Sequence, residues 1–269
     1  MGSGIAQVCA IAGLNVILND LNEETVNNGI ANISTNLNRM VAKAKIGEAE
    51  MVATLGRIKG TVTPGDLSNC QFLIEAATEN VEVKKKILET LEAIAGPECI
   101  IATNTSSGSI TKLAAALSNS SRFVGMHFFN PVPVMELVEV IQGMQTANAT
   151  FDETVALAQR IGKTVVTVKN SPGFVVNRIL IPMINEAAFV LQEGLASADD
   201  IDSAMRLGAN HPIGPLALAD LIGLDTLLAI MEVFYRDFAD DKYRPAPLLR
   251  EMVDAGYLGR KTKRGFFTY

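Results

Sequence analysis

The residue best suited to proton transfer is His127, one of two histidines in the 269-residue chain. It lies in Gly125-Met126-His127-Phe128-Phe129, at the end of an expected strand, and Glu139 follows among aliphatic residues in Leu137-Val138-Glu139-Val140-Ile141. A semi-buried carboxylate needs a partner. A carboxylate that orients a histidine and stabilises its cationic form makes an acid–base pair. The alternatives are a structural histidine and an exposed glutamate, and spacing alone does not decide between them.

Short polar side chains follow another expected strand end, in Asn104-Thr105-Ser106-Ser107. Ligands collect at the carboxyl ends of strands in open α/β sheets, so this run could bind a substrate oxygen. The alternative is a turn that caps a helix. Asn177, early in a later helix, could also reach a ligand.

Asp20 comes directly after the apolar run Asn15–Asn19 and lies 18 residues beyond Gly2. In dinucleotide-binding folds, an acid at the end of the second strand binds the adenosine ribose hydroxyls. A carboxylate there would repel a 2′-phosphate, which favours NAD over NADP. The alternative is an aspartate in a turn or a helix cap.

The elements that must position these residues alternate between helix and strand over the first half of the chain. Apolar strands between helices indicate a mostly parallel sheet covered on both faces, which is the doubly wound α/β class of Rossmann type. We expect helices over residues 4–12, 24–55 and 83–95, and strands over 15–19, 72–77, 99–102, 122–128, 137–141 and 164–168.

The pattern changes at the turn-rich stretch 169–173, beyond which the sequence is almost purely helical. Apolar residues recur at spacings of three and four from Val176 to Leu191, and Gly194 can close that helix. Ser197 and Asp200 predict the cap of the next helix. We therefore predict a nucleotide-binding domain over 1–168, with 24–55 as a helical insertion, and a helical domain over 169–269.

Composition narrows the possible partners. The net charge of −6 and the absence of a long basic run argue against nucleic acid. The most apolar stretch, 215–234, carries three acidic residues, so we expect a core helix and no membrane span. Three cysteines without metal-ligand spacing predict buried free thiols in a reducing cytoplasm, and no metal site.

Longer motifs then point to a family. The chain resembles the 3-hydroxyacyl-CoA dehydrogenases, and among them the bacterial 3-hydroxybutyryl-CoA dehydrogenases, from Met1 to Tyr269. The motifs are MGSGIAQVCAIAG, ATNTSS, GMHFFNPVPVMELVEVI, NSPGFVVNRIL, NHPIGPLALADLIGLD and GYLGRKTKRGFF. The resemblance implies NAD-dependent, reversible oxidation of (S)-3-hydroxyacyl-CoA, with 3-hydroxybutyryl-CoA as the expected substrate. It also implies a homodimer formed through a helical domain that binds the acyl-CoA substrate.

The resemblance assigns roles to matching positions. His127 matches the catalytic base and Glu139 its orienting partner, while Ser106 and Asn177 match residues that bind the reacting oxygen and position the substrate. The implied cofactor residues are Gly2, Asp20, Ala77, Glu79, Lys84 and Asn104. The implied acyl-CoA contacts are Asn36 and Lys43, although Lys43 could be an ordinary solvated lysine.

The chain departs from the family pattern in two places. Family members begin about a dozen residues earlier, with a central strand and the first two glycines of the nucleotide fingerprint. We therefore expect the printed chain to be a fragment or to have a misplaced start, since each missing buried apolar side chain would cost about 1.5–3 kcal/mol. Gly108 occupies a position where an aliphatic residue is expected. Two other functions stay open at this point: a dehydrogenase of free 3-hydroxy acids, and a truncated chain that cannot bind NAD.

Overall fold

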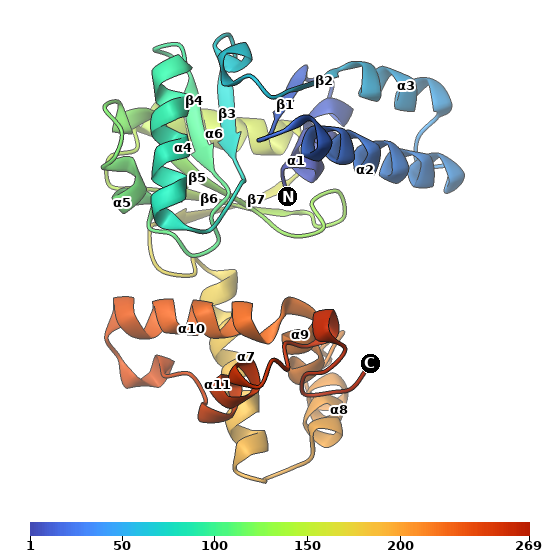
Figure 1. Ribbon diagram of the computed structural model, residues 1–269, viewed down its shortest axis with the longest axis vertical. Helices are drawn as coiled ribbons and strands as arrows, with labels where there is room; N and C mark the ends of the chain where they lie inside the picture. Colours follow the sequence, from blue (N-terminus) through green and yellow to red (C-terminus); the bar gives the residue numbers. More distant parts are fainter. The chain divides into compact units, whose positions relative to one another are not determined.

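The structure is a computed structural model that describes residues 1–269 (Figure 1). The chain forms two compact units, Met1–Asn170 and Ser171–Tyr269. The first unit is α/β and the second is helical. The predicted fold class, a Rossmann-type sheet followed by helices, is confirmed.

The first unit contains two sheets. β1 (Val16–Asn19) pairs with β2 (Ile58–Thr61), and a five-stranded sheet has the order β3-β4-β5-β6-β7. The strands of the larger sheet are β3 (Phe72–Glu75), β4 (Ile100–Thr103), β5 (Phe123–Phe128), β6 (Leu137–Gln142) and β7 (Thr164–Lys169). Every pair is parallel except β5 and β6. One sheet was predicted, but no ladder of hydrogen bonds joins β1 to β3.

Helices surround these strands in the first unit. They are α1 (Gly2–Ile11), α2 (Glu23–Ala42), α3 (Glu48–Gly56), α4 (Val81–Ile94), α5 (Ile110–Ala114) and α6 (Asn148–Arg160), with short 3-10 turns at Pro64–Leu67 and Ser120–Arg122. The long helix predicted over 24–55 is wrong in one respect. The chain leaves the helix at Ala44, whose φ of +52° no continuing helix can adopt, and restarts as α3.

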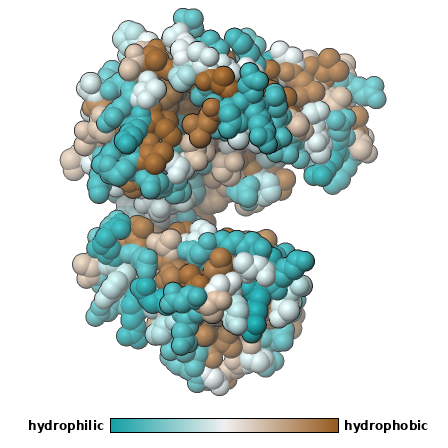
Figure 2. All heavy atoms as spheres, viewed as in Figure 1, coloured by the Kyte–Doolittle hydropathy of each residue, from teal (hydrophilic) through white to brown (hydrophobic).

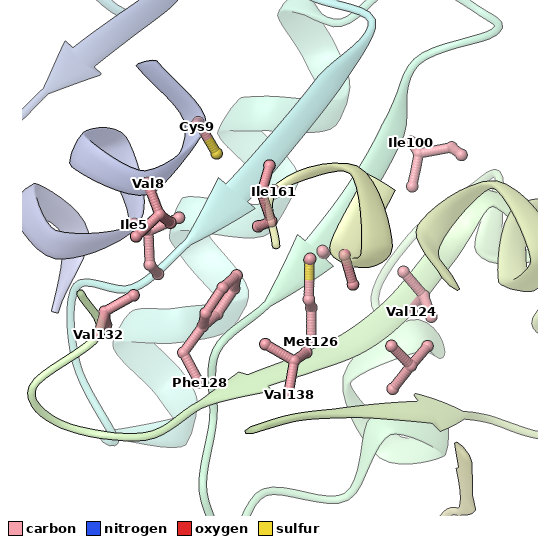
Figure 3. Close-up of a cluster of buried hydrophobic side chains, with 13 residues drawn as sticks. Ile5, Val8, Cys9, Ile100, Val124, Met126, Phe128, Val132, Val138 and Ile161 are labelled. Atoms are coloured by element: carbon pink, nitrogen blue, oxygen red, sulfur yellow. The ribbon is translucent and has the colours of Figure 1, made fainter. Parts of the chain in front are cut away.

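A buried apolar cluster fixes α1 and α6 against the larger sheet (Figure 3). Ile5, Val8 and Cys9 come from α1, while Met126 and Phe128 come from β5. Full burial of each large apolar side chain is worth about 1.5–3 kcal/mol. Strand β5, which ends beside His127, is therefore held in a well-packed core. Cys9, Cys70 and Cys99 are free thiols, of which Cys70 is only half-buried.

The second unit is built from α7 (Val176–Gln192), α8 (Ala198–Gly208), α9 (Pro215–Ile222), α10 (Leu224–Phe238) and α11 (Pro247–Asp254), with 3-10 turns at Asp241–Tyr243 and Arg260–Thr262. Ser197 caps α8 as predicted, because its Oγ accepts from the Asp200 N–H at 3.2 Å. The helix predicted over 215–234 is divided at Gly223, whose φ is +101°. None of the helices is long and apolar enough to cross a membrane. Figure 2 shows polar and apolar residues intermixed on each unit over the face drawn.

Candidate active site

His127 and Glu139 form a buried pair. They lie directly opposite each other on the antiparallel strands β5 and β6, so their side chains share one face of the sheet. His127 Nδ1 lies 2.8 Å from Glu139 Oε2, and the two residues are 6% and 0% exposed. The sheet register brings together two residues that the sequence placed twelve positions apart.

The partner of Nδ1 determines which ring nitrogen can exchange a proton. An ionised carboxylate only accepts hydrogen bonds, so Nδ1 carries the hydrogen in this pair. In the neutral ring, Nε2 is then the nitrogen that carries the lone pair. The Phe129 ring packs against the imidazole, with centroids 4.5 Å apart. The arrangement is that of a general base held in one tautomer.

Glu79 holds the polar run after β4. Its Oε2 accepts from Thr105 Oγ at 2.6 Å, and its Oε1 accepts from the backbone N–H and the Oγ of Ser106 at 2.7 and 2.8 Å. Gly108 closes the turn, because its N–H donates to the Thr105 hydroxyl at 2.9 Å. A Cβ at position 108 would lie 2.7 Å from that oxygen, which explains why glycine fits this sequence where an aliphatic residue was expected.

Asn104 links the ends of two strands. Its Oδ1 accepts from the Phe128 N–H at 2.8 Å, and its own N–H donates to the Glu75 carbonyl at 2.7 Å. The side chain is therefore engaged beside His127 and fixes the last residue of β5. The predicted contact of Asn104 with the cofactor remains a prediction.

Lys84 lies inside the first unit and not on its surface. Its ammonium group is 2.5 Å from Glu75 Oε2 and 3.3 Å from Thr103 Oγ, and the lysine and glutamate residues are 2% and 3% exposed. The other oxygen of Glu75 accepts from the Ala77 N–H at 2.9 Å. This buried network shapes the turn after β3, which contains Ala77 and leads to Glu79. The cofactor roles predicted for these residues remain predictions.

The start of α1 and the end of β1 have features that suit a dinucleotide. The first turn of α1 has no side-chain cap and no acidic residue, and open space surrounds Gly2 where a Cβ would stand. Uncapped N–H groups and the helix dipole favour a phosphate at such a terminus. Asp20 is exposed directly after β1, with Oδ1 accepting from the Leu21 N–H at 2.8 Å. These residues fit a pyrophosphate and a ribose.

Three further predicted residues lie at α2 and α7. Asn36 donates to Gln7 Oε1 at 3.3 Å, so its side chain is directed toward α1. Lys43 is the exposed C-terminal cap residue of α2. Asn177 lies on α7 in the second unit.

The sequence did not identify Lys163 as part of this region. This buried lysine, between α6 and β7, donates to the carbonyl oxygens of Val132 and Met135 in the turn that joins β5 to β6. No sequence signal could have found it, because a lysine after Ile-Gly at the end of a helix resembles a solvated residue.

An α/β unit with an uncapped helix N-terminus, an acidic residue after β1 and a buried histidine–carboxylate pair has the features of a dinucleotide-dependent oxidoreductase. The family model described as "3-hydroxyacyl-CoA dehydrogenase, NAD binding domain" matches residues 1–171, and "3-hydroxyacyl-CoA dehydrogenase, C-terminal domain" matches residues 173–269. The chain belongs to the 3-hydroxyacyl-CoA dehydrogenase family.

Individual relatives agree with the family model. The chain is 51% identical to a 3-hydroxybutyryl-CoA dehydrogenase of Bradyrhizobium diazoefficiens, covering 100% of this chain and 92% of that protein. It is 48% identical to a 3-hydroxybutyryl-CoA dehydrogenase of Clostridioides difficile, covering 100% and 96%. The crystal structure of (S)-3-hydroxybutyryl-CoA dehydrogenase from Ralstonia eutropha superposes with a TM-score of 0.99 at 59% identity, covering 100% of this chain and 95% of that one.

Proposed function

We propose that this chain catalyses the reversible, NAD-dependent oxidation of (S)-3-hydroxybutyryl-CoA to acetoacetyl-CoA, with His127 as general base and acid. The observation that carries the proposal is the buried contact of 2.8 Å between His127 Nδ1 and Glu139 Oε2. It leaves Nε2 as the nitrogen that exchanges a proton with substrate.

The proton moves between the substrate and the ring. Neutral His127 accepts the proton of the 3-hydroxyl group through Nε2 during oxidation. In the reverse direction the imidazolium returns that proton to the alkoxide oxygen. Glu139 stabilises the imidazolium and keeps the hydrogen of the neutral ring on Nδ1. Bound NAD supplies the acceptor for the hydride that leaves C3.

The cofactor site that we propose follows from the ends of α1 and β1. The N–H groups of the first turn of α1, including that of Gly2, bind the pyrophosphate, and Asp20 binds the adenosine ribose. The turn after β3, with Ala77 and Glu79, and the neighbouring Lys84 and Asn104 complete this site. The negative charge of Asp20 disfavours a 2′-phosphate, so we propose NAD rather than NADP.

The substrate contacts rest on the family resemblance. We propose that Ser106 binds the reacting oxygen, which its place after the strand end beside His127 supports. Asn36 and the exposed Lys43 are proposed contacts of the acyl-CoA, where a lysine suits the CoA phosphates. The substrate-positioning role of Asn177 is assigned by the resemblance alone.

The test is a pair of matched histidine variants. His127→Gln should abolish reduction of acetoacetyl-CoA by NADH and leave NADH binding, measured by fluorescence titration, nearly intact. His211→Gln removes the other histidine, which lies in the second unit, and should keep wild-type turnover. Wild-type turnover in His127→Gln would refute the assignment.

A second assay tests the substrate class. Turnover of acetoacetyl-CoA should far exceed turnover of free acetoacetate. The free acid has no CoA group and cannot make the proposed contacts on α2. Preferential reduction of the free acid would favour a 3-hydroxy acid dehydrogenase. A failure to bind NADH at all would favour a catalytically inert chain.

We also propose that the protein is a cytoplasmic homodimer formed through its second unit. Large apolar side chains are exposed on that unit, including Ile179 at 67% and Leu207 at 86%, and the cysteines are unpaired as a reducing compartment requires. Light scattering after gel filtration tests the dimer, and a monomeric mass would refute it.

A further inference from the structure

Residues 129–136, which we call the hairpin turn, connect the strand that carries His127 to the strand that carries Glu139. Within it, the N–H groups of Val134 and Met135 both donate to the Pro131 carbonyl, at 2.9 and 3.0 Å. The end of the turn is held by the Thr164 N–H, which donates to the Glu136 carbonyl at 2.8 Å. The position of this turn therefore affects both members of the pair.

Lys163 holds the middle of the hairpin turn. Its Nζ donates to the Val132 carbonyl at 2.6 Å and to the Met135 carbonyl at 2.8 Å, and the residue is 9% exposed. Burial lowers the pKa of this ammonium group, while the nearby Glu136 and Cys9 oppose that change. A buried lysine that donates hydrogen bonds to two backbone carbonyls fixes the backbone between them.

The hairpin turn also packs against α1. Val132 is 2% exposed and belongs to the same cluster as Ile5 and Val8 (Figure 3). A Cβ on Gly4 would lie 2.9 Å from the Val132 Cβ, so the first turn of α1 and the hairpin turn are in close contact. Lys163 thus fixes the hairpin turn where it contacts the helix that we propose binds the cofactor.

We infer that Lys163 is a positioning residue, which acts through the hairpin turn to hold His127 and Glu139 in register with each other and with the first turn of α1. This inference deepens the proposed function and rests on it. The acceptors of Lys163 are backbone carbonyls of the hairpin turn. Its effect is transmitted by the carbonyls of Val132 and Met135 and by the strands on either side.

The experiment replaces Lys163 with methionine, which keeps an unbranched side chain but donates no hydrogen bond. NMR of protein with ¹⁵N-labelled histidine reports on each ring separately, because the chain has two histidines. A His211→Gln sample assigns the signals. In Lys163→Met the His127 ring signals should move and those of His211 should not. Turnover of acetoacetyl-CoA should fall about 10- to 100-fold, since a displacement of about 1 Å can cost about 100-fold.

Two further variants decide the outcome. Lys86→Met removes an exposed lysine of α4 with the same change in charge, and it should leave the His127 signals and turnover unchanged. Lys163→Gln retains a donor and should fall between wild type and Lys163→Met. Unchanged His127 signals in a folded Lys163 variant would overturn the inference. Unfolding of both Lys163 variants would also overturn it, because Lys163 would then serve the fold and not the position of the pair.

The two readouts separate this inference from the proposed function. The NMR spectra need no substrate. A wild-type protein without turnover would refute the proposed reaction, and the His127 signals would still test the positioning role of Lys163. Conversely, if the wild-type enzyme is active and the His127 signals do not change in Lys163→Met, only the inference about Lys163 is refuted.

Discussion

Changing Glu139 to glutamine removes the negative charge of this side chain and keeps nearly the same shape, so it tests the contribution of the charge alone. The amide is nearly isosteric, and its oxygen can still accept the hydrogen bond from Nδ1 that the carboxylate accepts at 2.8 Å. What the variant loses is the negative charge that stabilises the imidazolium. Glu139 is fully buried, so water cannot replace that charge.

The size of the effect follows from the distance between the charges. Opposite unit charges about 4 Å apart interact by about 4 kcal/mol at an effective dielectric constant of about 20. Each 1.36 kcal/mol changes a rate tenfold, so complete loss of this interaction corresponds to about 10³-fold. Only part of the positive charge has developed in the transition state. We therefore expect Glu139→Gln to lower kcat by about 10²- to 10³-fold.

The assay is the initial rate of NADH oxidation with acetoacetyl-CoA, together with a fluorescence titration of NADH. The rate should fall while the Kd of NADH stays within about twofold, since Glu139 lies against the imidazole ring and is not one of the proposed cofactor residues. Glu153→Gln, on the exposed side of α6, removes one negative charge elsewhere and should behave as wild type. A loss of less than tenfold in a folded Glu139→Gln protein would mean that the charge contributes less than about 1.4 kcal/mol, and the reasoning would fail.

Three further results are expected. Lys84→Met should lower the free energy of unfolding in urea by about 3–5 kcal/mol, because it leaves the buried carboxylate of Glu75 unpaired; a change under about 1 kcal/mol would show that the pair is dispensable. Asp20→Ala should weaken NADH binding about 10-fold, the value of a hydrogen bond to a charged group, and should narrow the preference for NADH over NADPH; an unchanged ratio of the two Kd values would contradict the role of Asp20. Burial raises the pKa of Cys9 to about 11. The folded state therefore keeps the thiol protonated at pH values where the unfolded chain loses the proton. The stability that this provides is fully present below the pKa of the unfolded thiol and is lost as pH rises from about 9 toward 11. The urea stability of Cys9→Ala should therefore depend less on pH over that window than that of wild type, and parallel pH profiles would refute the shift.

Elements with a strong periodic pattern could be predicted from the sequence, and elements defined by their neighbours could not. Strands such as Phe123–Phe128 are continuously apolar because both faces of the sheet are covered, and they were expected within a residue of their ends. β2, with the sequence Ile-Lys-Gly-Thr, carries no such pattern and forms only because it pairs with β1. The break at Ala44 depends on a positive φ at an alanine, a residue type that does not mark such a position in a sequence.

The site divides in the same way. The types of residue that do chemistry, a histidine and a carboxylate at strand positions, were readable, and the register of β5 and β6 then placed them face to face. Two buried lysines of the same unit were hidden, because lysine is normally a surface residue and nothing near Lys84 or Lys163 marks either as buried. Both side chains are long enough to carry an ammonium group from a helix or a loop to a buried acceptor, which is Glu75 for Lys84 and the Val132 carbonyl for Lys163. A buried ammonium group needs such acceptors, so Lys84 fixes the turn after β3 and Lys163 fixes the hairpin turn between the strands of the histidine–glutamate pair.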